Sequence, residues 1–506
     1  MKKLLVLLFG LAFSSFIDSN KSDLVARNLI KQFSEKSDIR IKNYELISED
    51  NNDLIYIYHL EPQGFIIISA DSRSFPYLGY SFDNNLSINN IPNNFSFILN
   101  NYKKNIKDNI NNNTRLNSDI IEDEWVNLLQ ENYNSTSFRN VSPLLDSEWA
   151  QSGSWNNGLE FTNSNIPVGC VAVSMSQIMY YWSYPLQGSG FNSYNDDNFG
   201  QIEVDFETAY YDYDNMADLY ATSASQQLLY HTGVSVNMNY DFSGSGAQVH
   251  GIYPSAEFAL ENYFSYSSDI EAVFLEDYTQ TEFRNIIKNE LDNNRPILYS
   301  GYENLEYDGG HAWNVDGYNG NNIHCNWGWG GSSNGYFNLT TMGGFEAYQT
   351  ALINIIPETL TSPMALFEYE INDNNVNLFD LSDFINDSDI TQWIWDFGDG
   401  ASDTNFNGYA NHTYSNSGIY DISLIVKNMY GYFSEPHIEA IQIGSALSGD
   451  VNDDNILNIL DIVMMVNFVL GSQSPTDQQF NSSDMNDDSI LNILDIVTLV
   501  NTVLNS

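Results

Sequence analysis

The sequence predicts a multidomain protein in which two α+β units precede an all-β unit and a small α-helical unit that carries a repeated acidic loop. With 506 residues, the chain is too long for one core of the usual domain size of roughly 100 to 200 residues. Residues 141–356 are dense in Trp, Tyr and Gly, and residues 365–426 contain short β-like runs between Asp, Asn and Gly turns. An octapeptide occurs twice near the C-terminus. We therefore expect at least three folded units.

These composition changes divide the chain into five segments. The first begins with Met1 and two lysines and continues as an apolar run that ends near Phe16, which is too short to span a bilayer and indicates a cleaved export signal. We expect a secreted protein, extracellular or attached to a cell surface, with no membrane insertion. The expected boundaries are 1–19 for the signal, 20–135 and 136–358 for the two α+β units, 362–446 for the β unit and 448–506 for the repeat unit.

The chain is strongly acidic. Its formal net charge of −48 comes from 66 acidic and 18 basic residues. Nucleic acids and anionic membranes attract positive surfaces, so the charge argues against them as partners. Such a balance suits a calcium-rich exterior, and it equally suits a role in solubility alone.

Two cysteines occur, Cys170 and Cys325. In an exported protein two cysteines indicate one disulfide or a reactive thiol. A nucleophilic Cys170 has to be free, which leaves Cys325 as a buried thiol.

Cys170 follows a turn made by Pro167 and Gly169 and precedes apolar residues at helical spacing. This pattern predicts that Cys170 begins a buried helix. The partial positive charge at a helix N-terminus favours the thiolate, which is the nucleophilic form of cysteine.

His311 follows Gly309 and Gly310, and the alternation after it predicts a strand. It lies 141 residues after Cys170, the spacing of papain-like enzymes. An ion pair with a histidine lowers a cysteine pKa from about 8.5 to roughly 3 to 4. We therefore expect His311 to be the general base. His324, beside Cys325, is expected on the opposite face of its strand, so it forms no second dyad.

Two further groups complete the expected catalytic set. The amide of Asn326 is a candidate acceptor for the second imidazole nitrogen, with a neighbouring tryptophan, Trp327 or Trp329, shielding that bond from water. Gln151, upstream of the cysteine, is a candidate oxyanion donor together with the main-chain N–H of Cys170.

Together these motifs resemble the streptopain-type cysteine peptidases, which have the papain-like fold. The resemblance rests on the runs Val168–Ala172, Gly310–Ala312, Asp316–Gly317 and Asn326–Gly331. It implies an endopeptidase that acts on proteins or peptides, prefers a hydrophobic residue two positions before the scissile bond and needs no cofactor for catalysis. Ser243–Ala247 is similar to a stretch that lines the substrate cleft in this family.

Two other functions remain as alternatives. One is a non-catalytic surface-binding or assembly protein with a degenerate papain-like domain. The other is a papain-fold transferase or amidase that acts on amides other than peptide bonds.

Residues 20–135 resemble the propeptide of the same family through Gly64–Asp71 and Pro76–Tyr80. The resemblance implies a zymogen whose own propeptide occupies the cleft and holds His311 or Cys170 out of register; a folding-chaperone role fits the same sequence. The low complexity of Asn94–Asn113 predicts a weakly packed helix or a connector. We expect processing between Asn132 and Val141.

The β unit resembles a polycystic kidney disease (PKD) domain, an immunoglobulin-like β-sandwich. The resemblance rests on Trp395–Gly400, His412–Tyr414 and Gly418–Tyr420. Such domains act as spacers or as substrate-binding aids, and we favour a spacer in which His412 is structural.

The C-terminal repeat carries oxygen donors at the positions that bind Ca²⁺ in an EF-hand loop. Positions 1, 3, 5, 7, 9 and 12 of the two loops are held by Asp450, Asn452, Asp454, the Ile456 carbonyl, Asn458 and Asp461, and by Asp484, Asn486, Asp488, the Ile490 carbonyl, Asn492 and Asp495. We therefore expect two structural Ca²⁺ sites in a small helical domain of paired EF-hand-like loops.

This unit resembles a type I dockerin, which implies docking to a cohesin-like partner and an association with polysaccharide catabolism; a calcium-stabilised terminal cap is the alternative. It departs from the pattern at position 6, where Asn455 and Ser489 replace the usual glycine. Asn adopts the left-handed conformation more readily than Ser, so the second loop is expected to bind more weakly.

Overall fold

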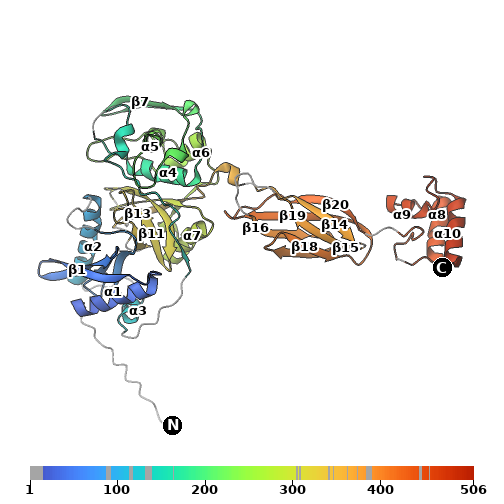
Figure 1. Ribbon diagram of the computed structural model, residues 1–506, viewed down its shortest axis with the longest axis horizontal. Coiled ribbons are helices and arrows are strands. Elements are labelled where there is room, and N and C mark those ends of the chain that lie inside the picture. Colours follow the sequence, from blue (N-terminus) through green and yellow to red (C-terminus); the bar gives the residue numbers. More distant parts are fainter. Residues whose placement is uncertain are drawn as a thin grey trace, which may run out of the picture. The chain divides into compact units, whose positions relative to one another are not determined.

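The computed structural model divides into two compact parts, Met1–Glu358 and Thr359–Ser506 (Figure 1). The first part contains the two α+β units, and the second contains the β unit and the helical unit. The structure describes residues 15–86, 93–112, 118–130, 139–162, 165–303, 306, 309–339, 342, 344–345, 347–361, 363–372, 374–382, 390–443, 447–454 and 456–505. Most of the expected export signal, and the processing loop through residues 131–136, lie outside these residues.

The N-terminal α+β unit consists of three helices and a four-stranded antiparallel sheet. Its elements are α1 (Ser19–Phe33), β1 (Arg40–Glu49), β2 (Asn52–Glu61), β3 (Phe65–Ser69), β4 (Tyr77–Ser81), α2 (Asn93–Asn112) and α3 (Ser118–Leu128). Helix α2 was expected to pack weakly, and that prediction is wrong: Phe95, Ile98, Tyr102 and Ile106 are buried. The apolar residues recur at helical spacing within the Asn-rich sequence, so composition masked an amphipathic helix.

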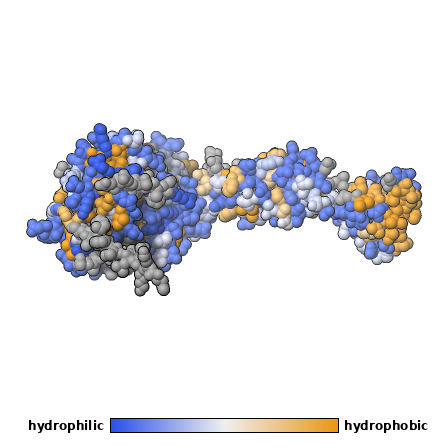
Figure 2. Space-filling view, turned by 90° about the horizontal axis from the view of Figure 1, so that it is seen from below, coloured by the Kyte–Doolittle hydropathy of each residue, from blue (hydrophilic) through white to orange (hydrophobic). Residues whose placement is uncertain are grey.

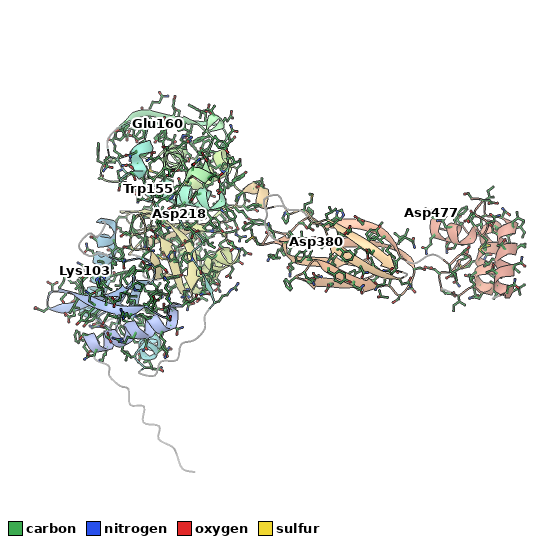
Figure 3. The ribbon with its side chains drawn as sticks, in the orientation of Figure 1. Lys103, Trp155, Glu160, Asp218, Asp380 and Asp477 are labelled. Atoms are coloured by element: carbon green, nitrogen blue, oxygen red, sulfur yellow. The ribbon has the colours of Figure 1, made fainter. Side chains whose placement is uncertain are left out.

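The second α+β unit contains a helical lobe and a sheet lobe (Figure 1). Its elements are β5 (Asn140–Val141), α4 (Cys170–Trp182), β6 (Phe191–Asp196), β7 (Gly200–Asp205), α5 (Ser223–Ser235), α6 (Ala256–Phe264), β8 (Glu271–Phe274), α7 (Gln280–Asp292), β9 (Ile297–Tyr302), β10 (His311–Asn319), β11 (Asn322–Asn326), β12 (Gly335–Asn338) and β13 (Ala347–Ile353). Helices α4, α5 and α6 pack with β7 around one apolar core, and helix α7 and strands β8 to β13 contribute to another. Trp155 and Asp218 lie where the two lobes meet (Figure 3).

One sheet runs through both α+β units. Its strand order is β1-β2-β3-β4-β12-β11-β10-β9-β13-β8, with β5 paired to β10. The junction is the antiparallel pair β4–β12, where Tyr80 faces Tyr336. A single apolar core contains residues of both units, including Phe95 of α2 and Trp327 after β11. The N-terminal unit is therefore integrated into the fold of the second unit.

The third unit is a β-sandwich, as predicted. Its strands are β14 (Phe367–Asn372), β15 (Asn375–Asp380), β16 (Ile390–Asp396), β17 (Ser402–Asn405), β18 (Tyr409–Thr413), β19 (Gly418–Asn428) and β20 (His437–Ile443). They form a three-stranded sheet, β14-β15-β18, and a four-stranded sheet, β17-β16-β19-β20, around buried Trp395. The His412 ring stacks on Phe397, with centroids 4.2 Å apart, and its Nε2 bonds Asp399 at 2.8 Å. These contacts give His412 a structural role.

The C-terminal unit is helical, with α8 (Ile459–Val469), α9 (Asp477–Ser483) and α10 (Ile493–Asn505). The two repeat helices, α8 and α10, pack through Met465 and Leu499, which are both fully buried. Across the part of the chain that the structure describes, no helix has the length and apolar character needed to cross a membrane.

Candidate active site

Cys170 is the first residue of α4, as predicted. The N-cap is Gly169, with φ 94°, and a Cβ atom added there would lie 2.5 Å from the Met238 sulfur. Glycine is therefore required both for the turn and for the close packing behind it. Every residue from Val171 to Met179 is buried, so the helix start is held rigidly.

The segment Ser243–Ala247 lies beside this turn. Its Ser245 hydroxyl donates to the carbonyl of Pro167 at 2.6 Å, and its Gly246 pairs with Asn239. The stretch expected to line the cleft is thus fixed against the loop that leads into Cys170.

His311 is the first residue of β10 and is buried among aromatic rings. The Trp329 ring stacks on the imidazole with centroids 5.0 Å apart, while Trp313 and Trp327 lie at 5.8 and 6.2 Å. The sequence left open which tryptophan covers His311, and in the structure Trp329 is nearest. Phe345, at 5.4 Å, also contacts the ring and was not predicted.

The imidazole is oriented by a main-chain group. His311 Nε2 lies 3.1 Å from the carbonyl oxygen of Trp327. A carbonyl only accepts hydrogen bonds, so Nε2 carries the proton and Nδ1 is left as the basic nitrogen. This acceptor role was expected of the Asn326 side chain. Asn326 instead donates from Nδ2 to the Ser147 carbonyl at 2.7 Å and accepts from Gly328 N–H at 3.3 Å.

Gln151 lies on the segment that runs between these two elements. Its main-chain carbonyl accepts from Val168 N–H at 2.9 Å, two residues before Cys170. The preceding residue, Ala150, pairs with Trp329 in an isolated β-bridge. The Gln151 segment therefore lies next to both the cysteine turn and the aromatic cover of His311.

The environment favours neutral forms of both predicted catalytic groups. Burial raises the pKa of the Cys170 thiol, an effect partly offset by the main-chain N–H groups of Ala312, Val171 and Cys170. Burial lowers the pKa of His311 to about 4, partly offset by the Trp327 carbonyl. These directions are opposite to those of the expected ion pair. Among the hydrogen bonds of the described residues, none joins the Cys170 and His311 side chains.

Cys325 is a free, buried thiol, and Cys170 is also free, so the two form no disulfide. Cys325 Sγ lies 3.4 Å from the Met342 sulfur in the core. Its neighbour His324 bonds Asp316 at 2.6 Å from the other face of β11, as the strand alternation predicted.

The N-terminal unit reaches the His311 environment through α2. Asn101 Nδ2 donates to the carbonyl of Gly344 at 3.2 Å, and the following residue is Phe345, which contacts the imidazole. No sequence motif marked this contact, because it joins residues 243 positions apart.

The C-terminal loops keep the predicted donors together. Asp461 and Asp495 are fully buried and accept main-chain N–H bonds from their own loops, such as Val451 N–H at 2.9 Å and Met485 N–H at 3.0 Å. Carboxylate, amide and carbonyl oxygens are the donor set that a hard cation prefers. Among the described residues, no group of three or more His, Cys, Asp or Glu side chains is arranged to hold a metal ion.

The backbone at position 6 of the second loop is left-handed, as expected at a position that usually holds glycine. Ser489, at position 6, has φ 60°. Asn455, the equivalent residue in the first loop, lies outside the described residues.

Comparisons with known proteins agree with this architecture. The Peptidase C10 family matches residues 149–337, the Spi protease inhibitor family matches 14–106, the PKD domain matches 361–442 and the Dockerin type I domain matches 448–504. Streptopain of Streptococcus pyogenes serotype M28 is 29% identical over 394 residues, which cover 69% of this chain and 96% of streptopain.

Two solved structures from Prevotella intermedia are also similar. A prointerpain A fragment has a TM-score of 0.49 at 26% identity and covers 62% of this chain and 99% of its own. Active interpain A has a TM-score of 0.39 at 30% identity and covers 43% and 95%.

The family matches and the fold define a cysteine peptidase with an N-terminal inhibitor propeptide. The chain contains a peptidase C10 (streptopain-like) domain, a PKD domain and a type I dockerin domain. The expected link to polysaccharide catabolism finds no support in these matches.

Proposed function

We propose that the chain is an exported endopeptidase made as a zymogen, in which Cys170 is the nucleophile and His311 the general base. The observation that carries the proposal is that α4 and β10 begin close together: the main-chain N–H of Ala312, the residue after His311, lies near enough to the Cys170 thiol to offset part of the rise that burial causes in its pKa. The two predicted groups thus begin two different elements at one place in the fold. The domain boundaries expected from the sequence remain part of this proposal.

The mechanism follows from the nitrogen that the Trp327 carbonyl leaves free. Nδ1 of His311 accepts the Cys170 proton, and the thiolate attacks the carbonyl carbon of the scissile bond. The Cys170 N–H and the Gln151 side-chain amide donate to the oxygen that becomes negative. His311 then gives its proton to the leaving nitrogen, and it later activates the water that hydrolyses the acyl-enzyme.

We infer that the propeptide helps to keep both catalytic groups neutral, because its residue Asn101 bonds Gly344, which precedes the Phe345 ring that contacts His311. In the propeptide-containing chain, burial disfavours both the thiolate and the imidazolium. Removal of the propeptide lets water reach the pair, which favours the charged state needed for attack. We place processing between Asn132 and Val141.

The dockerin domain is proposed to bind calcium at two structural sites and to dock to a cohesin-like partner. Apolar surface gathers on this domain (Figure 2). Five exposed apolar side chains of the first repeat recur at the same spacing in the second. They are Ile456, Ile459, Leu460, Val463 and Leu470, and Ile490, Ile493, Leu494, Val497 and Leu504. Contiguous exposed apolar surface marks an interaction site.

The charge of the dockerin domain restricts the kind of surface that its partner can present. Residues 448–506 contain nine aspartates and no lysine, arginine or histidine. The domain therefore offers no cation for an ion pair, and its partner needs an apolar centre with a neutral or basic rim. Loss of cohesin binding in a Val463→Asp, Val497→Asp double variant that still binds Ca²⁺ would support docking. Failure of the wild-type domain to bind would leave the terminal-cap role.

The peptidase proposal is tested with propeptide-free protein and its Cys170→Ala variant. We expect an epoxide thiol inhibitor to label Cys170 stoichiometrically and casein to be hydrolysed by the wild type alone. Labelling without hydrolysis of any peptide would favour an amidase or transferase. Neither labelling nor hydrolysis in folded, calcium-loaded protein would favour a non-catalytic binding protein.

A further inference from the structure

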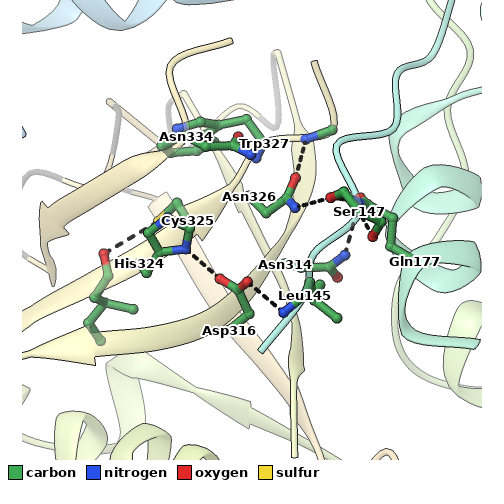
Figure 4. A network of polar contacts seen from close by, with 12 residues as sticks. Leu145, Ser147, Gln177, Asn314, Asp316, His324, Cys325, Asn326, Trp327 and Asn334 are labelled. Atoms are coloured by element: carbon green, nitrogen blue, oxygen red, sulfur yellow. Dashed lines mark hydrogen bonds and ion pairs between the residues drawn. The ribbon is translucent and has the colours of Figure 1, made fainter. Parts of the chain in front are cut away.

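Ser147 lies at the junction of three parts of the proposed machinery. Its main-chain carbonyl accepts two side-chain amide hydrogen bonds, from Gln177 Nε2 at 2.6 Å and from Asn326 Nδ2 at 2.7 Å. Figure 4 shows these two amides converging on Ser147. All three residues are buried, so both bonds form away from water, where a lost partner is costly.

Each donor comes from an element that carries a catalytic group. Gln177 is on α4, two turns after Cys170. Asn326 ends β11 and is followed by Trp327, whose carbonyl holds His311. Ser147 itself lies four residues before Gln151, the proposed oxyanion donor. The single carbonyl of Ser147 therefore joins the nucleophile helix, the base-orienting loop and the oxyanion segment.

Further contacts fix both sides of this junction. The Gln177 side chain cannot turn freely, because its Oε1 faces Asn314 Nδ2 at 3.5 Å and its Nε2 also reaches the Ser147 hydroxyl at 3.1 Å. On the oxyanion segment, Leu145 N–H donates to the Asp316 carboxylate at 3.2 Å, and the other oxygen of that carboxylate bonds His324. Figure 4 shows the same network from Asp316 to Gln177.

The geometry points to Gln177 and Asn326 as positioning residues for the oxyanion hole. They act through the Ser147 carbonyl and set the place of the Gln151 amide relative to Cys170. This role differs from the one expected for Asn326, which was to orient His311, and Gln177 was not expected to contribute at all. The inference rests on the proposed roles of Cys170 and Gln151. A displacement of about 1 Å in such a group is enough to cost roughly 10²-fold in rate.

The test compares Gln177→Met with Ser176→Ala in propeptide-free enzyme. Methionine preserves the length of the side chain but donates no hydrogen bond. Ser176 is the matched control: it is buried on the same helix and bonds Thr232 at 2.8 Å, away from Ser147. Two inhibitors separate the functions, because an epoxide reports the Cys170 thiolate while a peptide aldehyde forms a hemithioacetal whose oxygen needs the oxyanion hole.

For Gln177→Met we expect kcat and aldehyde affinity to fall at least 10-fold, with KM and the rate of epoxide labelling within twofold of wild type. Asn326→Asp keeps the acceptor for Gly328 N–H but loses the donor to the Ser147 carbonyl. It should lose kcat and aldehyde affinity in the same way while keeping KM and epoxide labelling. It tests the positioning role if Gln177→Met does not fold. Equal losses with both inhibitors, or the same split in Ser176→Ala, would overturn the positioning role. An unlabelled, inactive wild type would instead refute the proposed function.

Discussion

Tyr80 of the propeptide strand β4 stacks on Tyr336 of the catalytic strand β12, with ring centroids 5.2 Å apart. The same two residues pair across the strands, so the ring contact and the sheet junction coincide. Tyr80 also stacks on Phe33 of α1, with ring centroids 5.1 Å apart. The propeptide is thus held by a continuous sheet and a shared core, in addition to any part of it that enters the cleft. Cleavage of the connecting segment alone should not release it.

Replacing Tyr80 tests whether the shared sheet and core hold the propeptide on the catalytic domain. We expect Tyr80→Ala to destabilise the zymogen by about 3 to 5 kcal/mol, because a fully buried aromatic ring and its stacking partners are lost. Urea unfolding in a Cys170→Ala background measures the change without self-digestion. In the active enzyme, the same variant should mature faster. Tyr44→Ala, at an exposed position of β1, is the control and should leave maturation unchanged.

Acid should lower the folding stability of the zymogen through protonation of His311. Its pKa in the folded chain is about 4, below the usual 6.5, so between these values the unfolded chain binds the proton more readily. Stability is therefore lost as the pH falls from 6.5 toward 4, by about 2 kcal/mol at pH 5 for this group. Urea midpoints at pH 7.5 and 5.0 in the Cys170→Ala protein measure the loss.

A matched histidine makes this pH test specific. His231 is also buried, with its pKa lowered to about 4, and it bonds Tyr211 at 3.1 Å away from the catalytic groups. His311→Gln and His231→Gln should each remove part of the pH dependence. Because the pKa of each histidine is lowered to about 4, the two variants should remove similar parts of that pH dependence. An unchanged pH dependence in His311→Gln would contradict the assignment.

The sequence predicted the positions that local patterns determine. Cys170 was placed at a helix start and His311 at a strand start because turn glycines and apolar spacing are local signals. The role of Asn326 was not predictable in this way. Side-chain amides and main-chain carbonyls accept hydrogen bonds equally well, so the choice of Trp327 over Asn326 depends on the path of the loop.

Long-range contacts also escaped sequence reasoning. Asp316 was part of a recognised motif, but its bond to His324 depends on how β10 pairs with β11, and its bond to Leu145 depends on how β10 pairs with β5. Phe345 belongs to no recognised sequence motif. It contacts His311 because the strand that follows it, β13, pairs with β9. The Asn-rich composition of α2 hid a helix whose burial becomes evident only beside the catalytic sheet.

Trp329 should support catalysis as the nearest aromatic cover of His311. In Trp329→Ala, water reaches the bond between His311 Nε2 and the Trp327 carbonyl, and the imidazole loses its fixed orientation. We expect kcat/KM to fall about 10-fold, which corresponds to roughly 1.4 kcal/mol. Steady-state hydrolysis of a peptide substrate measures the loss. Trp329→Phe retains an apolar ring and should recover most of the activity; equal losses in the two variants would argue against shielding.

Ser489 should limit calcium binding in the second dockerin loop. It adopts φ 60°, a conformation that costs a residue with a Cβ atom about 1 kcal/mol or more relative to glycine. We expect Ser489→Gly to tighten Ca²⁺ binding at that loop about fivefold, measured by titration calorimetry of the full chain. Asp495→Ala removes a fully buried loop carboxylate and should abolish the same binding step. Weaker binding in Ser489→Gly would mean that the serine side chain itself supports the loop, and that backbone strain does not set its affinity.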